Sequence, residues 1–216
     1  MAFSLLVVKL AEGLLVAIAI FALTLLFSLP LGLLVAFGRM SKNFLLRNIV
    51  KFYISIMRGT PLVLQLMVVY FGPYYLFRIP LGYSYRFVAT IIGFSLNYAA
   101  YFAEIYRGGI LSMPAGQYEA AQVLGYNKTQ TFVRIIFPQV VRRILPAVTN
   151  EVITLVKDTS LAFAISVGEM FTTAKAIAAA QSNMLPFIVA GVFYYLFNSV
   201  VAFATEAVEK RLSYYQ

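Results

Sequence analysis

Long uncharged apolar runs decide what this chain of 216 residues can fold into. Four such runs extend over residues 13–38, 59–77, 87–103 and 176–205. A helix needs roughly 17–25 predominantly apolar residues to cross the hydrocarbon core of a membrane, and each run reaches that length. With 62% hydrophobic and only 12% charged residues, the composition lies outside the range of soluble domains. The sequence therefore predicts an all-α integral membrane protein.

A fifth stretch, residues 144–167, has the same length but carries Glu151, Lys157 and Asp158. The first run is too long for the apolar region of a signal peptide and no basic cluster precedes it, so we expect it to remain as the first span. We predict a single transmembrane domain over residues 1–216, with five transmembrane helices at approximately 13–38, 59–77, 87–107, 144–168 and 186–206.

Lysine and arginine residues predict the orientation, because they concentrate in the cytoplasmic segments of membrane proteins. The segments after the first and third spans, together with the C-terminal tail, hold twelve of them, against four on the other side. We therefore predict an N-terminus outside and a C-terminus in the cytoplasm. A nucleic-acid-binding face would need clustered basic residues interleaved with aromatic ones. We read the net charge of +9 as a topology signal and expect lipid, not nucleic acid, as a partner.

The chain contains neither cysteine nor histidine. Disulfides, thiol nucleophiles, imidazole bases and the usual zinc or haem ligands are therefore excluded. Its eight carboxylates form no obvious catalytic pair, and the phosphate-binding pattern GxxxxGK[ST] is missing. We predict no catalytic residues, no metal site and no cofactor bound by this chain.

The segment 108–143, between the third and fourth spans, does not look like a simple linker. Pro114 and Gly116 are expected to break the chain before a helical piece, Gly125 to end that piece, and Thr129 to cap the next helix. We predict a short helix lying across the cytoplasmic face. Its exposed side is expected to carry small and polar residues, namely Glu119, Ala120 and Gln122.

This segment also carries a motif. EAAQVLG at residues 119–125, followed nine residues later by IIFP, resembles the EAA signature of permease subunits of ABC importers. The matching positions are Glu119, Ala120, Ala121, Gly125, Ile135 and Pro138, and Phe137 stands where the pattern has leucine. RGTPLVLQ at residues 58–65, AEIYRGGILSMPAGQYEAA at 103–121 and KDTSLAF at 157–163 resemble the subfamily that imports polar amino acids.

The resemblance implies a non-enzymatic permease of the bacterial or archaeal plasma membrane, coupled to a separate ATPase through Glu119, Ala120, Ala121 and Gly125. It implies two ATP-binding subunits that hold ATP and Mg²⁺, an extracytoplasmic amino-acid-binding protein, and a second permease subunit, identical or related. Five helices would form only half of an enclosed path. An ion-coupled secondary transporter is the alternative, although the small number of helices and the lack of a visible internal repeat count against it.

Polar residues inside the spans predict the solute path. Positions seven apart on a helix return to within roughly 20° of each other, so Glu151 and Asp158 share a face. The same spacing relates Asn97 and Glu104 in the third span. If the fourth helix continues without a break, Glu169 lies close to the acidic stripe. Charged side chains at mid-depth cost on the order of 2.5–3.5 kcal/mol each, so they are expected to face water, a partner or a substrate.

Pro61 predicts a break in the second span, because proline lacks an amide donor and disfavours helical geometry in the residue before it. Irregular backbone in a membrane lines a cavity or is buried in protein, which makes Thr60 and Gln65 candidates for the path. A span that simply starts at Pro61 is an equal alternative.

Thr159 and Ser160 add hydroxyl groups beside Asp158. Two or three acidic groups favour a cationic solute over an anionic one, so we expect polar and preferentially basic amino acids. The alternative is that Lys157, Asp158 and Glu151 form ion pairs between helices and only hold the bundle together.

Overall fold

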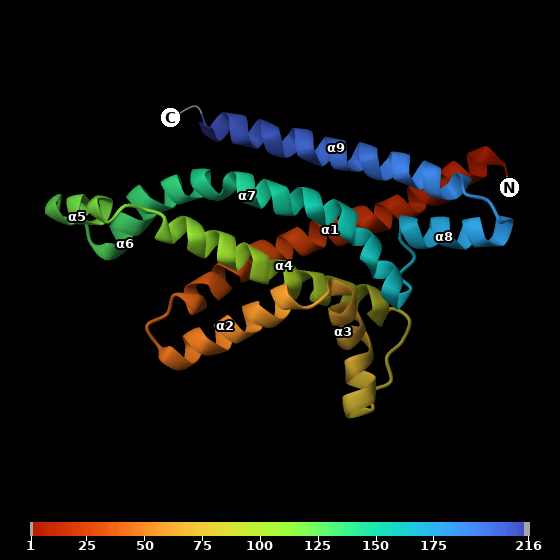
Figure 1. The fold of residues 1–216 in the computed structure, drawn as a ribbon, viewed down its shortest axis with the longest axis horizontal. Helices are drawn as coiled ribbons and strands as arrows, with labels where there is room; N and C mark the ends of the chain where they lie inside the picture. Colours follow the sequence, from red (N-terminus) through yellow and green to blue (C-terminus); the bar gives the residue numbers. More distant parts are fainter. Residues whose placement is uncertain (1, 214–216) are drawn as a thin grey trace.

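The computed structural model describes residues 2–213, and all regular structure in them is helical (Figure 1). The elements in chain order are α1 (Phe3–Arg39), α2 (Phe44–Gly59), α3 (Leu62–Phe77), α4 (Tyr85–Leu111), α5 (Ala115–Val123), α6 (Lys128–Gln130), the π-helix η1 (Thr131–Ile136), α7 (Phe137–Asp158), the 3₁₀-helix η2 (Thr159–Ile165), α8 (Met170–Gln181) and α9 (Leu185–Ser213). An all-helical fold is therefore confirmed for residues 2–213.

Helices α1 and α4 pack along the centre of an elongated bundle (Figure 1). The buried side of α1 carries small and hydroxyl side chains, among them Gly13, Thr24 and Gly32. At Gly32 an added Cβ atom would lie 2.8 Å from the Cβ of Phe102 on α4. Small residues at such contacts let helix backbones approach closely, which is a main source of helix association in lipid.

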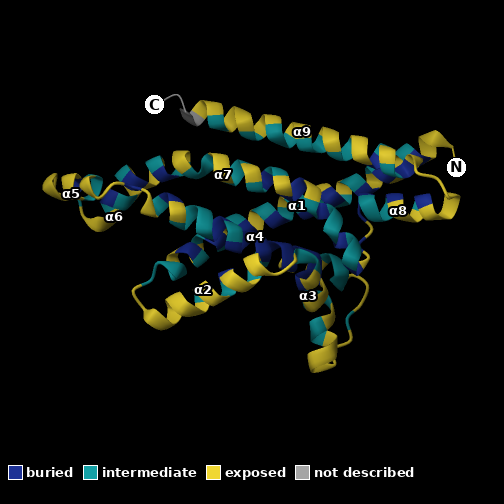
Figure 2. Cartoon of the chain, in the orientation of Figure 1, coloured by how far each residue is buried: buried dark blue, intermediate teal, exposed yellow. Residues whose placement is uncertain are grey.

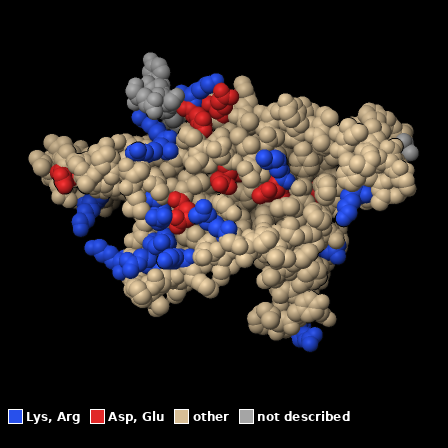
Figure 3. Space-filling view, viewed as in Figure 1, with Lys and Arg blue, Asp and Glu red and all other residues tan. Residues whose placement is uncertain are grey.

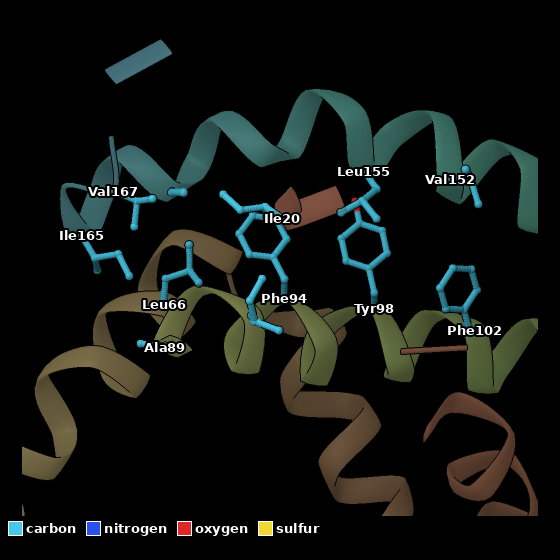
Figure 4. Packing of buried hydrophobic residues seen from close by; sticks show 12 residues of the cluster. Ile20, Leu66, Ala89, Phe94, Tyr98, Phe102, Val152, Leu155, Ile165 and Val167 are labelled. Atoms are coloured by element: carbon cyan, nitrogen blue, oxygen red, sulfur yellow. The ribbon is translucent and has the colours of Figure 1, made fainter. Parts of the chain in front are cut away.

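A second layer of packing joins α4 to α7. Phe94, Tyr98 and Phe102 on α4 point toward α7, where Val152 and Leu155 meet them (Figure 4). The outer surfaces of α2 and α9 are largely exposed and apolar (Figure 2). Exposed apolar helix faces of this kind suit contact with lipid or with another membrane protein.

Three helices within residues 2–213 are long and apolar enough to cross a membrane, namely α1, α4 and α9. Two bent pairs also pass this test when each is taken as one unit: α2 with α3, bent by 112°, and residues 128–165 with α8, bent by 57°. The number of candidate spans therefore lies between three and five, and several candidate spans are confirmed.

The second predicted span, residues 59–77, differs from the structure at its start. Residues 44–58 form most of α2, whereas the prediction left them in a cytoplasmic segment. Their three basic residues hid the amphipathic helix from a search for uncharged runs. The predicted break is present, since Gly59 ends α2, Thr60 is extended and α3 starts at Leu62.

The fourth predicted span, residues 144–168, is not one continuous helix. The α-helix ends at Asp158, η2 follows, and Ser166 adopts a left-handed conformation with φ of 58°. The condition for placing Glu169 beside the acidic stripe, an unbroken fourth helix, is therefore not met. Glu169 is fully buried and caps α8 instead, where its carboxylate accepts hydrogen bonds from the backbone N–H groups of Phe171 and Thr172.

Two details of the segment 108–143 also need correction. Gly116 lies inside α5, whose N-cap is Pro114. Asn127, not Thr129, caps the next helix, because its side chain accepts the backbone N–H of Gln130 in a reciprocal capping box. The expected helix end is present, with Gly125 in the left-handed region at φ of 79°.

Candidate solute-binding site

The break between α2 and α3 is held by two side-chain amides. The Nε2 group of Gln65 on α3 donates to the carbonyls of Met57 (2.9 Å) and Thr60 (3.1 Å), which end α2 without helical partners. Asn97 on α4 donates to the Met57 carbonyl (3.0 Å) and to Oε1 of Gln65 (2.9 Å). Because unpaired carbonyls are costly away from water, this Gln65–Asn97 clamp stabilises the bend and fixes it against α4.

Beside the clamp lies a polar cavity of about 220 Å³. Its walls come from the α2–α3 junction, α4 and α7, and its lining residues are Thr60, Pro61, Leu62, Asn97, Tyr98, Tyr101, Glu151, Thr154 and Asp158. The volume is below the roughly 300–1,000 Å³ of pockets for drug-sized ligands, so the cavity suits a small solute. We name it the acidic cavity.

Another cavity of about 250 Å³ lies between α1, α4, η1 and α7, but its lining is almost entirely apolar. A zwitterionic or charged solute placed there would lose its hydrogen bonds to water without replacement. The acidic cavity is therefore the better candidate for a polar solute.

Two carboxylates face the acidic cavity from α7. Oδ2 of Asp158 accepts a hydrogen bond from the Tyr98 hydroxyl at 2.7 Å. Within residues 2–213, the Glu151 carboxylate takes part in no hydrogen bond, and neither carboxylate belongs to an ion pair shorter than 4.0 Å. Seven residues of α-helix separate the two groups by about 10 Å. The cavity thus offers two acidic groups in its lining, one already bound to a hydroxyl and one open.

The structure brings together four of the predicted path residues, Asp158, Glu151, Asn97 and Thr60, in the lining of this cavity. The predicted ion pairs between helices are not formed by Glu151 or Asp158 within residues 2–213. Lys157, next in sequence to Asp158, is exposed and does not line the cavity.

The structure does not bring the other four predicted residues into the lining. Gln65 is buried in the clamp. Glu104 binds Arg107 on its own helix at 2.6 Å and lies 3.9 Å from Arg39 of α1. The hydroxyls of Thr159 and Ser160 each donate to the backbone carbonyl three residues earlier, at 2.8 Å.

Sequence reasoning missed two aromatic residues of the lining, Tyr98 and Tyr101. Helical spacing places Thr154 near the face shared by Glu151 and Asp158, and the structure adds it to the lining although it was not among the predicted path residues. The same spacing contains the signal for Tyr101, which lies four residues after Asn97 and so shares a helix face with a predicted residue. Tyr98 follows only from the packing of α4 against α7.

The residues of the EAA motif lie far from the cavity, at the end of the molecule that carries α5 (Figure 1). Glu119, Ala120 and Gly125 are exposed there, as expected for a docking surface. Ala121 is only 1% exposed, so its side chain faces the rest of the protein and helps to hold α5 in place. The chain continues from α5 through α6 and η1 into α7, the helix with both cavity carboxylates.

Charge is unevenly distributed over the face seen in Figure 3, where Lys and Arg side chains gather toward the end that carries α5. Acidic side chains are visible near the middle of the same face, and others lie at the end that carries α5 and near the grey atoms. Basic groups therefore concentrate toward one end of the bundle, and negative charge is present at its middle.

Comparisons with known proteins agree with this architecture. Residues 28–214 match the sequence profile of the family described as "Binding-protein-dependent transport system inner membrane component". The arginine transport system permease protein ArtQ of Bacillus subtilis is 38% identical over 93% of this chain and 91% of its own length. The L-cystine transport system permease protein TcyB of the same organism is 36% identical over 95% and 87%.

Among solved structures, a crystal structure of an amino acid ABC transporter with histidines is 28% identical in sequence. The match covers 94% of both chains with a TM-score of 0.85. Similarity therefore extends over nearly the whole chain in both sequence and fold.

Proposed function

Because the chain belongs to the family of inner membrane components of binding-protein-dependent transport systems, we propose that its acidic cavity carries polar, preferentially basic, amino acids in an ATP-driven importer. Members of this family are non-catalytic permease components of ABC transporters of the bacterial inner membrane. Relatives transport arginine and L-cystine according to their names, so amino-acid transport is common to them whereas the charge of the solute is not.

The preference for basic amino acids is supported by the chemistry of the cavity. Glu151 and Asp158 are half-buried and line one small cavity. A cation brought between them recovers by charge attraction part of the hydration it loses, whereas an anion is repelled. The open Glu151 carboxylate is the single observation that carries this proposal, since half-buried carboxylates without a partner are unfavourable unless something else binds them.

The proposed topology has five spans in a single transmembrane domain over residues 1–216. They are α1, the bent pair α2–α3, α4, α7 with η2 and the bent α8, and α9. The N-terminus is outside and the C-terminus in the cytoplasm. Support comes from the basic side chains gathered toward the α5 end (Figure 3), because cytoplasmic segments are rich in Lys and Arg.

Coupling to the ATPase is proposed to occur through α5 in the loop 108–143. The exposed residues Glu119, Ala120 and Gly125 would contact the ATPase, while buried Ala121 holds α5 on the permease. The family implies an ATPase subunit and a substrate-binding protein. We propose two ATPase copies, which hold ATP and Mg²⁺, and a second permease subunit that completes the path.

The proposal is tested with the permease, its ATPase and its binding protein reconstituted in lipid vesicles. Uptake of radiolabelled lysine and glutamine is measured in three conditions: with ATP on the side of the membrane that carries the ATPase, with an ion gradient alone, and with neither. We expect uptake only with ATP, and lysine to be taken up in preference to glutamine. Uptake driven by an ion gradient without the ATPase would refute the proposed mechanism.

A further inference from the structure

One positive charge lies at the edge of the acidic cavity without lining it. Arg58 belongs to the last turn of α2, directly before the break at Thr60. Its guanidinium carbon lies 5.3 Å from the centroid of the Tyr101 ring, and Tyr101 is part of the cavity lining. Stacking of a guanidinium on an aromatic face holds the side chain in place without using its hydrogen-bond donors.

Two acidic residues are connected to Tyr101, the residue that Arg58 stacks on: Glu104 lies three residues later on α4, and Glu151 lines the same cavity as Tyr101. Glu104 already accepts two hydrogen bonds from Arg107, at 2.6 and 3.0 Å, and Arg39 lies nearby. Glu151 has no such partner within residues 2–213. The charge of Arg58 is therefore most useful to Glu151, whose carboxylate is otherwise unbalanced.

The remaining charges around Glu151 are accounted for. Asp158 lies about 10 Å away along the same helix and is bound to the Tyr98 hydroxyl. Lys157 is exposed and does not line the cavity. Arg58 is thus a basic side chain held beside the cavity that Glu151 lines.

We propose that Arg58 is a tethered cation that sets the charge selectivity of the acidic cavity. When the cavity is empty, Arg58 partly balances Glu151. The side-chain cation of a basic amino acid must compete with Arg58 for that carboxylate, whereas a neutral amino acid brings no second cation beyond its α-ammonium group and binds while Arg58 remains in place. Arg58 therefore lowers the preference for basic over neutral solutes and keeps the cavity usable by both. This inference rests on the proposed solute site.

The expected effect is modest, because Arg58 is exposed and exposed ion pairs contribute little. Removing its charge should tighten lysine binding by about three- to tenfold. Glutamine binding should change by less than about twofold, since its side chain carries no charge to compete. The ratio of the two dissociation constants is the quantity that the inference predicts.

The experiment measures binding of radiolabelled lysine and glutamine to the purified permease–ATPase complex without the binding protein, so that the selectivity of the binding protein does not contribute. Wild type is compared with Arg58→Gln, which keeps a long polar side chain. Arg47→Gln is the matched control, because Arg47 is also an exposed arginine of α2 but contacts Phe44. We expect Arg58→Gln alone to raise the lysine preference.

Arg58→Lys provides the second variant, since it keeps the charge and should retain the wild-type ratio. Equal changes for lysine and glutamine in Arg58→Gln, or a raised lysine preference in Arg58→Lys, would overturn the role of Arg58. If Arg58→Gln fails to assemble, the ratio in Arg58→Lys decides. A wild-type complex that binds neither amino acid would instead count against the proposed solute site.

Discussion

The sharpest test of the acidic cavity is the substitution Asp158→Asn. It removes one negative charge and nearly preserves the shape of the side chain. The Tyr98 hydroxyl, which donates to Asp158 at 2.7 Å, retains an acceptor in the amide oxygen of asparagine. The local packing between α4 and α7 should therefore survive, and the change reports mainly on charge.

The magnitude follows from the position of the carboxylate. A cation about 4 Å from Asp158 would gain about 4 kcal/mol of Coulomb energy at an effective dielectric constant of about 20. Desolvation returns part of this gain, and hydrogen bonds to charged groups contribute about 1.5–3 kcal/mol in net terms. We therefore expect about a 10- to 150-fold loss for lysine or arginine. Glutamine should lose less than about threefold, because it gains no comparable charge attraction.

The assay is the concentration of each amino acid that gives half-maximal uptake in vesicles containing the complete importer. Lys157→Gln is the matched control, because it alters the neighbouring charge, which is exposed and outside the cavity lining. We expect it to change either value by less than about threefold. Equal losses for lysine and glutamine in Asp158→Asn would mean that the carboxylate has a structural role, and the reasoning from charge would be refuted.

Three further changes test the scaffold. Gly125→Pro should abolish uptake while ATP hydrolysis by the complex persists, because Gly125 has φ of 79°, which proline does not adopt; unchanged uptake would refute coupling through this turn. Gln65→Leu removes the donor to the carbonyls of Met57 and Thr60 and the acceptor for Asn97. At about 0.6 kcal/mol per hydrogen bond in membrane proteins, the free energy of unfolding should fall by about 2 kcal/mol. An unchanged midpoint of thermal unfolding would contradict the clamp. Gly13→Leu should lower the unfolding temperature, because its Cβ atom would lie 2.7 Å from the Met170 backbone; Gly191→Leu, which meets nothing within 4 Å, is the control, and equal shifts would contradict the packing argument.

The helical membrane fold could be predicted because lipid leaves so few choices. Long apolar runs in lipid form helices, since every backbone group must find its hydrogen bond within the protein. The shared face of Glu151 and Asp158 followed from helical periodicity alone and is present in the cavity lining. Helical spacing correctly predicts which residues share a face when one regular α-helix connects them.

The same arithmetic failed where the helix type changed. Beyond Asp158 two short polar residues lead back into an apolar sequence, and nothing in the hydrophobic periodicity marks the change to a 3₁₀-helix. Hydroxyls of Thr159 and Ser160 bond to carbonyls three residues earlier, and such side-chain bonds compete with helical backbone geometry. Short polar side chains after a charged residue were the available signal, and we had assigned them to the solute path.

Glu104 shows a different limit. Its spacing from Asn97 predicted a shared face, but the pairing partner on its own helix decides where the carboxylate points. Arg107 lies three residues later, a spacing at which opposite charges meet on a helix. Weighing this local pair against the longer spacing would have removed Glu104 from the path. By contrast, the contact between Tyr98 and Asp158 joins residues 60 positions apart, and only the tertiary fold supplies it.

The walls of the acidic cavity are connected to α5 by two different routes, which bears on how ATP hydrolysis would act on the cavity. One wall is fixed by the Gln65–Asn97 clamp, which ties α2, α3 and α4 together. The other wall is α7, which continues through η1 to α5. A load applied to α5 in the proposed mechanism reaches α7 through α6 and η1, and it reaches α4 through the short connection that precedes α5. The Tyr98–Asp158 hydrogen bond joins these two walls, and a cationic solute at Asp158 would compete with it, so solute binding and movement of α7 act on the same contact.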